Sequence, residues 1–174
     1  MSAKNDSKQK IIKCASVGDQ FVGKSALFVR QFHGKFLRQK TAGVDFQIFV
    51  LKKGNEEIKF QFWDLGYRSR QEGLKVYPQT SILIMIYDIT NRISFTNIQK
   101  YYGDYVRQGN KKSIIALVGN KKDLNEYREV SFLEGQELGK QLGVYFFEVS
   151  AFTGENVKDL YEFLIDKSID TVQF

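Results

Sequence analysis

The sequence predicts a doubly wound α/β domain built on a mostly parallel sheet. Apolar runs of strand length alternate along the chain with segments of helical periodicity. Three runs, near residues 81–87, 113–118 and 144–149, are almost continuously apolar, as expected of central strands that are buried on both faces. With 174 residues, 43% of them apolar, the chain can bury the core that one such domain needs.

The expected elements begin at residue 10. Residues 1–9 are polar and are expected to be a flexible N-terminus, residues 10–168 one domain, and residues 169–174 a short C-terminal end. The expected strands are Lys10–Val17, Val44–Leu51, Ile58–Trp63, Ser81–Tyr87, Ser113–Val118 and Val144–Val149, with a turn at Gly54–Asn55 between the second and the third. The expected helices are Lys24–Phe32, Phe95–Gln108, Phe132–Gln141 and Asn156–Lys167.

Charge and cysteine content restrict the class of protein. The net charge is +6 and the isoelectric point about 9.3, but lysine and arginine are dispersed, which is typical of a solvated surface. Attraction to an anionic membrane or to nucleic acid is the alternative; no motif supports it, so we expect no nucleic-acid partner. Cys14 has no second cysteine to pair with, and no signal region or membrane-length apolar run is present, so we expect a cytoplasmic protein.

Residues 18–25, GDQFVGKS, match the phosphate-loop pattern G-x-x-x-x-G-K-[ST] between a strand and a helix. Inward backbone N–H groups and the positive end of the helix attract polyphosphate there, and Lys24 is expected to reach the outer phosphates. The alternative is a glycine turn before a helix, which the flanking strand and helix disfavour. The residues expected to bind the nucleotide in this segment are Gly18, Phe21, Val22, Gly23, Lys24, Ser25 and Ala26.

Three oxygen-bearing side chains are candidates for holding Mg²⁺, a hard cation that prefers oxygen ligands. The Ser25 hydroxyl belongs to the phosphate loop, and Asp64 ends the expected strand Ile58–Trp63. Alone, Asp64 would more often be a turn or capping residue. Thr41 is the candidate hydroxyl that closes on the metal when a third phosphate is present.

A second motif predicts a site that reads guanine. Asn120, Lys121 and Asp123 form N-K-x-D after an apolar run, and the Asp123 carboxylate can accept from both N1–H and the 2-amino group of guanine. Asn120 would brace the loop, and the Lys121 stem would lie across the base. After the next strand, Ser150 and Ala151 follow, and the Ala151 N–H is expected to meet the guanine O6. Alone, N-K-K-D is an ordinary charged turn.

Phe36 is a candidate for packing on the face of the base. It follows the expected helix Lys24–Phe32. From the spacing alone, plain packing at the helix end is as good an interpretation.

Together these residues resemble the Ras superfamily of small GTPases, most closely its Rab branch, over residues 10–167. The matching stretches are GDQFVGKS (18–25), TAGVDF (41–46), FQFWD (60–64), IYDITN (86–91), GNKKD (119–123) and EVSAFTGENV (148–157). The resemblance implies a P-loop NTPase fold with six strands, five helices and two mobile switch segments. It implies a monomer that binds GTP or GDP with Mg²⁺, uses Lys24 and Thr41 in hydrolysis, and acts in vesicle traffic.

Partners and location also follow from the resemblance. Effector proteins, a nucleotide exchange factor and a GTPase-activating protein are expected, on endomembranes to which the protein attaches peripherally. Rab proteins end in a tail with prenylated cysteines, whereas the sequence ends at Phe174 without one, so we expect that membrane association is not encoded in it. Either a tail has been removed, or the domain is anchored otherwise, or it is one half of a longer protein.

The departures from the family concern catalysis. The family has W-D-T-A-G-Q where this chain has W-D-L-G-Y-R at 63–68. Gly66 is the candidate for the family's glycine in this motif. The glutamine that positions the attacking water is missing, and Tyr67 stands near its place. Gln20 and Phe21 occupy positions where the family has small residues, and their bulk should disturb water and arginine placement. Gln20 or Gln71 is a weak candidate for replacing the glutamine. The first switch also looks shortened.

Phe152 replaces the lysine that usually follows Ser-Ala in the family. Its ring is a candidate for covering the base.

Slow GTP hydrolysis is therefore the leading expectation. The alternative is a nucleotide-bound interaction module without meaningful catalysis, which partner binding in the GDP and GTP states would distinguish. An ATP-using P-loop kinase would leave N-K-x-D unexplained, and nucleic-acid binding would depend on charge alone.

Overall fold

The structure, a computed structural model, describes residues 10–36, 44–54, 56–65 and 75–172. Its strands are β1 (Lys10–Val17), β2 (Val44–Lys53), β3 (Glu56–Leu65), β4 (Ile82–Asp88), β5 (Ile114–Asn120) and β6 (Tyr145–Glu148). The α-helices in the described part are α1 (Lys24–His33), α3 (Arg92–Thr96), α4 (Ile98–Gln108), α5 (Phe132–Leu142) and α6 (Val157–Val172). Two 3₁₀ turns, η1 (Tyr77–Gln79) and η2 (Lys122–Tyr127), complete the described elements. The predicted α/β class is confirmed, with six strands and five α-helices among the residues that the structure describes.

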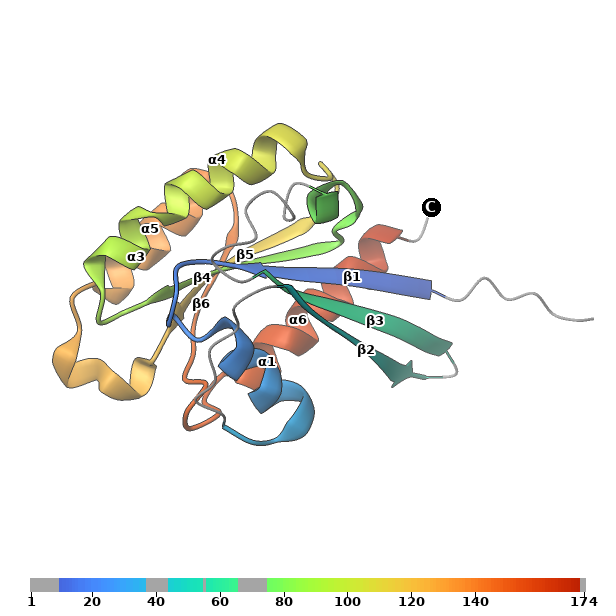
Figure 1. The fold of residues 1–174 in the computed structure, drawn as a ribbon, viewed down its shortest axis with the longest axis horizontal. Coiled ribbons are helices and arrows are strands. Elements are labelled where there is room, and N and C mark those ends of the chain that lie inside the picture. The colour runs from blue at the N-terminus through green and yellow to red at the C-terminus, as the bar shows by residue number, and fades with distance from the viewer. Residues whose placement is uncertain (1–9, 37–43, 55, 66–74, 173–174) are drawn as a thin grey trace, which may run out of the picture.

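The six strands form one sheet in the order β2-β3-β1-β4-β5-β6 (Figure 1). Among the pairs described, β2 and β3 run antiparallel and the others are parallel. The first described strand, β1, lies inside the sheet, and later strands lie on either side of it. In open α/β sheets such a switch of direction leaves a crevice at the carboxyl ends of the strands, where ligands bind.

Two hydrophobic cores lie on opposite faces of the sheet. One contains residues of α1 and α6, such as Phe28, whose ring stacks on Phe62 of β3 with centroids 3.9 Å apart. The other contains residues of α4 and α5, such as Tyr105 and Leu138. Every residue of β4 is buried, because this central strand is covered on both faces.

Two helices differ from the sequence-based expectation. The segment expected as one helix, Phe95–Gln108, is divided at Asn97 into α3 and α4. It begins earlier because the Asn91 side chain accepts from the N–H groups of Ile93 (3.0 Å) and Ser94 (3.2 Å), which is a helix cap.

Helix α6 continues to Val172 rather than ending at Lys167. Ser168 is buried and Ile169 packs against the core, so the inward face of the helix extends beyond the expected end. Within the described part of the chain, none of the helices has the length and apolarity needed to cross a membrane.

Candidate functional site

The loop between β1 and α1 is tightly packed against its neighbours. Gly18 has φ +149°, and a Cβ there would lie 2.2 Å from the carbonyl oxygen of Ile86 in β4. Gly23 has φ +98°, and a Cβ there would lie 2.2 Å from Nδ2 of Asn120. Both positions therefore require glycine, for the backbone conformation and for the close approach. The loop predicted as a phosphate cradle is thus pressed onto the ends of β4 and β5.

Lys24 lies beneath this loop and is only 7% exposed. Its ammonium donates to the carbonyl oxygens of Gly18 (2.9 Å) and Asp19 (2.7 Å). Burial lowers the pKa of Lys24 from its ordinary value, and the carboxylates of Asp64 and Asp19 oppose this shift. Among the described residues, no carboxylate forms an ion pair with it. A buried cation that meets only neutral carbonyls suits an anionic ligand such as polyphosphate.

The loop is also anchored to α4 through a contact that sequence analysis missed. The Asp19 carboxylate accepts from Nδ2 of Asn97 (2.7 Å) and from the hydroxyl of Tyr101 (2.8 Å). These partners lie 78 and 82 residues further along the chain, and no motif links them. The side chain of Asp19 is therefore held away as a brace, while its carbonyl oxygen contacts Lys24.

Ser25 and Asp64, two of the predicted metal ligands, are in direct contact. The Ser25 hydroxyl donates to one carboxylate oxygen of Asp64, and the Ser16 hydroxyl donates to the other (3.3 Å). Asp64 is 2% exposed, at the end of β3. A hydroxyl and a carboxylate that meet beside a lysine fit the oxygen ligands of Mg²⁺. Thr41, the third predicted ligand, lies outside the described residues.

Asn120 connects the phosphate loop to the loop after β6. Its Nδ2 donates to the carbonyl oxygen of Val22 (2.8 Å), and its Oδ1 accepts from the N–H of Ala151 (3.0 Å). Asn120 is 1% exposed, so these bonds are shielded from water. The Ala151 N–H, expected to donate to guanine, donates to Asn120 in this structure. The two candidate binding loops are thereby fixed to one another.

Asp123 and Lys121 lie where β5 leads into η2. The Ser150 hydroxyl donates to Oδ1 of Asp123 at 2.5 Å, so the loop after β6 orients the carboxylate expected to read the base. Lys121 has a left-handed backbone, φ 69°, and its ammonium pairs with Asp88 at 2.5 Å. These two contacts hold the side chains of N-K-x-D in defined directions at the edge of the sheet.

The remaining predicted site residues fall into two groups. Val22 is 1% exposed and Ala26 packs against the core, so their side chains face inward. Phe21 and Phe152 are 69% and 55% exposed, and Phe36 meets the Phe152 ring edge-on. Phe21 has φ 65°, a conformation that is costly for a side chain of this size.

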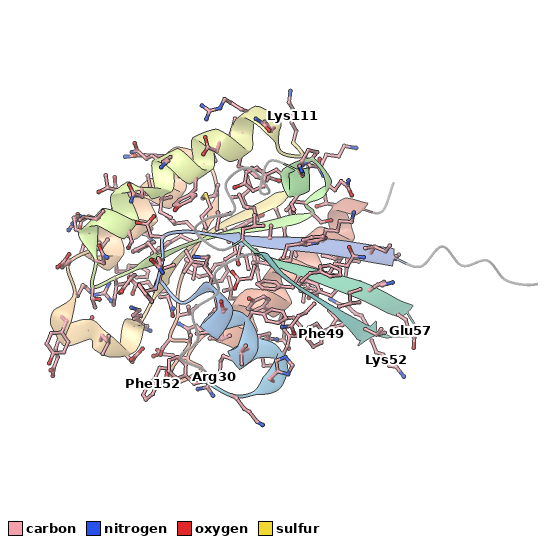
Figure 2. All side chains as sticks on the ribbon, in the orientation of Figure 1. Arg30, Phe49, Lys52, Glu57, Lys111 and Phe152 are labelled. Carbon is pink, nitrogen blue, oxygen red and sulfur yellow. The ribbon has the colours of Figure 1, made fainter. Side chains whose placement is uncertain are left out.

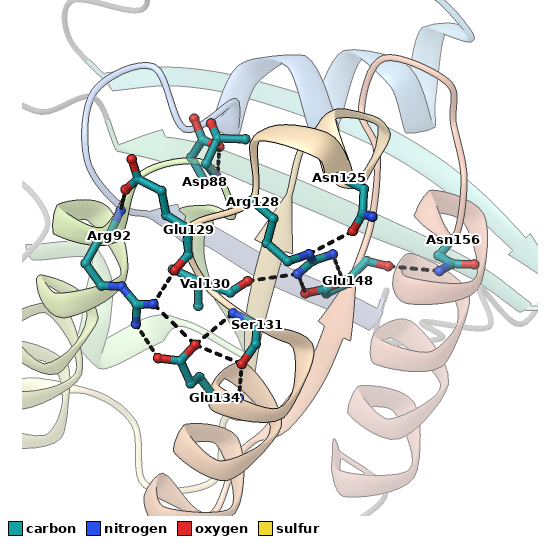
Figure 3. A network of polar contacts seen from close by, with 11 residues as sticks. Asp88, Arg92, Asn125, Arg128, Glu129, Val130, Ser131, Glu134, Glu148 and Asn156 are labelled. Atoms are coloured by element: carbon teal, nitrogen blue, oxygen red, sulfur yellow. Dashed lines mark hydrogen bonds and ion pairs between the residues drawn. The ribbon is translucent and has the colours of Figure 1, made fainter.

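A network of polar contacts lies next to the two loops expected to bind the base, those after β5 and after β6 (Figure 3). Arg128 donates from its two terminal nitrogens to the two carboxylate oxygens of Glu148, at 2.6 and 2.9 Å. The carbonyl oxygen of Glu148 accepts from Nδ2 of Asn156 (2.9 Å). Further on, Arg92 pairs with Glu134, which also accepts from the N–H of Ser131 (2.8 Å) in a capping box. The network joins α3, α5 and the segments beside η2, β6 and α6.

Glu134 makes this network sensitive to acid. The hydrogen bond from Arg92, and then those from Ser131, lower the pKa of Glu134 from 4.5 to about 2. A carboxylate with a lowered pKa stabilises the fold above its ordinary pKa, and this contribution is lost as the pH falls toward the folded-state value. We expect Glu134→Gln to lower the urea midpoint at neutral pH, and its difference from the unmodified protein to shrink between about pH 4.5 and 2. Glu137→Gln, an exposed change on the same helix, serves as the control, and a pH-independent difference would contradict the expectation.

Sequence comparisons show which known proteins this chain is similar to. A sequence model of the Ras family matches residues 13–170. The chain is 36% identical over 155 residues to "Ras-related protein Rab-4" of Dictyostelium discoideum, covering 87% of this chain and 76% of that protein. It is 35% identical over 165 residues to "Ras-related protein Rab5A" of Oryza sativa subsp. japonica, covering 92% and 81%. It is 36% identical over 168 residues to "Ras-related protein SEC4" of Candida albicans, covering 92% and 80%.

The family match spans nearly all of the described elements, from β1 to α6. It also spans every residue predicted from the sequence to bind nucleotide or metal. The chain therefore belongs to the Ras family and is a Rab-like small GTPase.

Proposed function

We propose that this protein is a guanine-nucleotide switch of vesicle traffic that holds GDP or GTP with Mg²⁺ and hydrolyses GTP slowly. The observation that carries the proposal is the bridge made by Asn120, which joins the phosphate loop at Val22 to the loop of Ala151. Lys24 belongs to the phosphate loop, and Asp123 accepts a hydrogen bond from Ser150, which precedes Ala151. One nucleotide can then contact Lys24 with its phosphates and Asp123 with its base.

The Rab-named relatives support the role in vesicle traffic. Effectors, an exchange factor and a GTPase-activating protein are the partners that such a switch requires. Thr41 is proposed to complete the metal site in the GTP state, together with Ser25 and Asp64. Bound Mg²⁺ would supply charge stabilisation at the phosphates.

Slow hydrolysis is proposed from two departures from the family's sequence pattern. Residues 66–68 contain no glutamine that could position the attacking water. In the phosphate loop, Nε2 of Gln20 is buried and has no hydrogen-bond partner among the described residues. A buried donor without a partner needs a ligand or a water to satisfy it. Gln20 and the left-handed Phe21 therefore add bulk and an unpaired donor where the family has small residues.

Single-turnover phosphate release from GTP-loaded protein tests this proposal. We expect a rate below the intrinsic rate of typical family members, which is on the order of 10⁻⁴ s⁻¹. A rate at or above that value would contradict slow hydrolysis. Release no faster than from GTP in protein-free buffer would instead favour the interaction module without catalysis. Partner binding to the GDP and GTP forms then separates a switch, which prefers one form, from a scaffold.

A further inference from the structure

The side chain of Asp19 places a negative charge inside the loop that is expected to bind phosphates. Asp19 directly follows Gly18, the first glycine of the motif, and its carbonyl oxygen accepts from the Lys24 ammonium at 2.7 Å. A carboxylate at this point opposes the binding of an anion, because like charges repel each other and because Lys24 could pair with the carboxylate instead. The loop therefore suits polyphosphate only while the carboxylate is kept away from Lys24.

Two side chains at the beginning of α4 hold the carboxylate of Asp19. Nδ2 of Asn97 donates to one of its oxygens (2.7 Å), and the hydroxyl of Tyr101 donates to the other (2.8 Å). Asn97 directly precedes α4 and Tyr101 lies four residues later, so both side chains project from one face of the helix. In Figure 2 the beginning of α4 and the loop after β1 lie at the same end of the sheet, whereas Lys111 is labelled beyond the other end of this helix.

The ammonium of Lys24 is within reach of the same carboxylate. It lies 2.7 Å from the carbonyl oxygen of Asp19, and the carboxylate is attached to the same Cα, so rotation about χ1 of Asp19 can bring the two charges together. Among the described residues, the partners of this buried ammonium are the carbonyl oxygens of Gly18 and Asp19. In such an environment an ion pair is stronger than in water, so it would compete with phosphates for the ammonium.

We propose that Asn97 and Tyr101 are positioning residues that keep the Asp19 carboxylate turned toward α4. The Lys24 ammonium then stays available for the outer phosphates of the nucleotide. This inference rests on the proposed guanine-nucleotide binding. Loss of either donor lets the carboxylate pair with Lys24 and weakens nucleotide binding, whereas loss of the carboxylate itself removes the competitor.

Association and dissociation rates of GDP with a fluorescent label on its ribose, measured with Mg²⁺ present, give the dissociation constants that test this role. We expect Tyr101→Phe to weaken GDP binding about tenfold, the size of one hydrogen bond to a charged group. Asn97→Leu removes the other donor at similar side-chain volume and should weaken binding comparably. Tyr102→Phe is the matched control, because the Tyr102 hydroxyl donates to the carbonyl oxygen of Leu142 (3.0 Å). It should bind GDP as the unmodified protein does.

Removing the carboxylate separates this role from that of a purely structural brace. We expect Asp19→Ala alone to bind GDP at least as tightly as the unmodified protein, because no carboxylate at this position competes for Lys24. In the Tyr101→Phe background, Asp19→Ala should restore most of the lost affinity, which is a non-additive result. A brace that only fixes the loop gives the opposite result: Asp19→Ala alone would weaken binding as much as Tyr101→Phe, and the double variant would show no recovery.

Unchanged GDP affinity in both Tyr101→Phe and Asn97→Leu, or no recovery in the double variant, would overturn the positioning role while leaving guanine-nucleotide binding intact. Failure of the unmodified protein to bind GDP would instead overturn the proposed function. Should Asn97→Leu fail to fold, Tyr101→Phe and its combination with Asp19→Ala decide the question, since Tyr101→Phe removes only a hydroxyl group.

Discussion

Asp123→Asn is expected to lower the affinity for GDP by a factor on the order of 10³ or more, because an amide NH₂ would face the donors of guanine. The same change should favour xanthosine diphosphate, whose base has a carbonyl in place of the 2-amino group. The asparagine could then accept from N1–H and donate to that carbonyl. Ser150, which donates to Oδ1 at 2.5 Å in the unmodified protein, can still donate to the amide oxygen.

Competition between labelled GDP and unlabelled GDP, xanthosine diphosphate or ADP measures this reversal. Glu126→Gln removes one carboxylate from the same turn η2 at an exposed position and controls for the change in charge. It should leave all three affinities near those of the unmodified protein. Equal GDP affinity in Asp123→Asn, with no gain for xanthosine diphosphate, would show that Asp123 does not read the base.

The second large effect is expected at the ion pair between Arg128 and Glu148. The Glu148 side chain is 3% exposed and that of Arg128 19%. Arg128→Met leaves a buried carboxylate without its two donors, which costs about 3 kcal/mol of the free energy of unfolding. Because Glu148 ends β6, next to the loop of Ser150, the change should also loosen the base-reading loop.

Urea unfolding at a fixed saturating GDP and Mg²⁺ concentration measures this loss. Lys158→Met is the control: Lys158 and Glu162 are 3.6 Å apart and well exposed, and such pairs contribute less than about 0.5 kcal/mol. The double change Arg128→Met with Glu148→Leu should recover much of the loss, since no unpaired charge remains. A loss in Arg128→Met as small as in Lys158→Met would mean that the carboxylate finds other partners or water.

The strands and helices were predictable from the sequence where a local pattern of apolar residues marks them. The strands β4 and β5 were located from apolar runs, because burial on both faces leaves few polar residues in them. The third run, residues 144–149, was predicted as a central strand and this is wrong: β6 lies at the edge of the sheet, and Tyr145 is 40% exposed. The early start of α3 was missed, because it depends on the Asn91 side chain capping a helix that starts before its apolar pattern. The end of α6 was missed because its last turns contain the polar but buried Ser168.

The candidate site was predictable where a motif is contiguous. Ser25 follows Lys24, and Asn120 lies next to Lys121, so spacing alone places each set on one loop. Spacing could not show that the Ala151 N–H donates to Asn120, nor that Ser16 shares the carboxylate of Asp64. Those bonds depend on which strand ends lie side by side.

The sequence by itself determined the doubly wound sheet and the loops at its carboxyl edge, because each is specified by residues close together in the chain. Only the tertiary structure decided that Asp19 is braced by Asn97 and Tyr101, and that Arg30 joins Gly34 to Ala151 and Phe152. From the sequence alone, a hydrogen-bond donor such as the Arg30 guanidinium has many possible acceptors. Packing of α1 and α4 against the sheet selects one of them, and that selection turns separate motifs into one site.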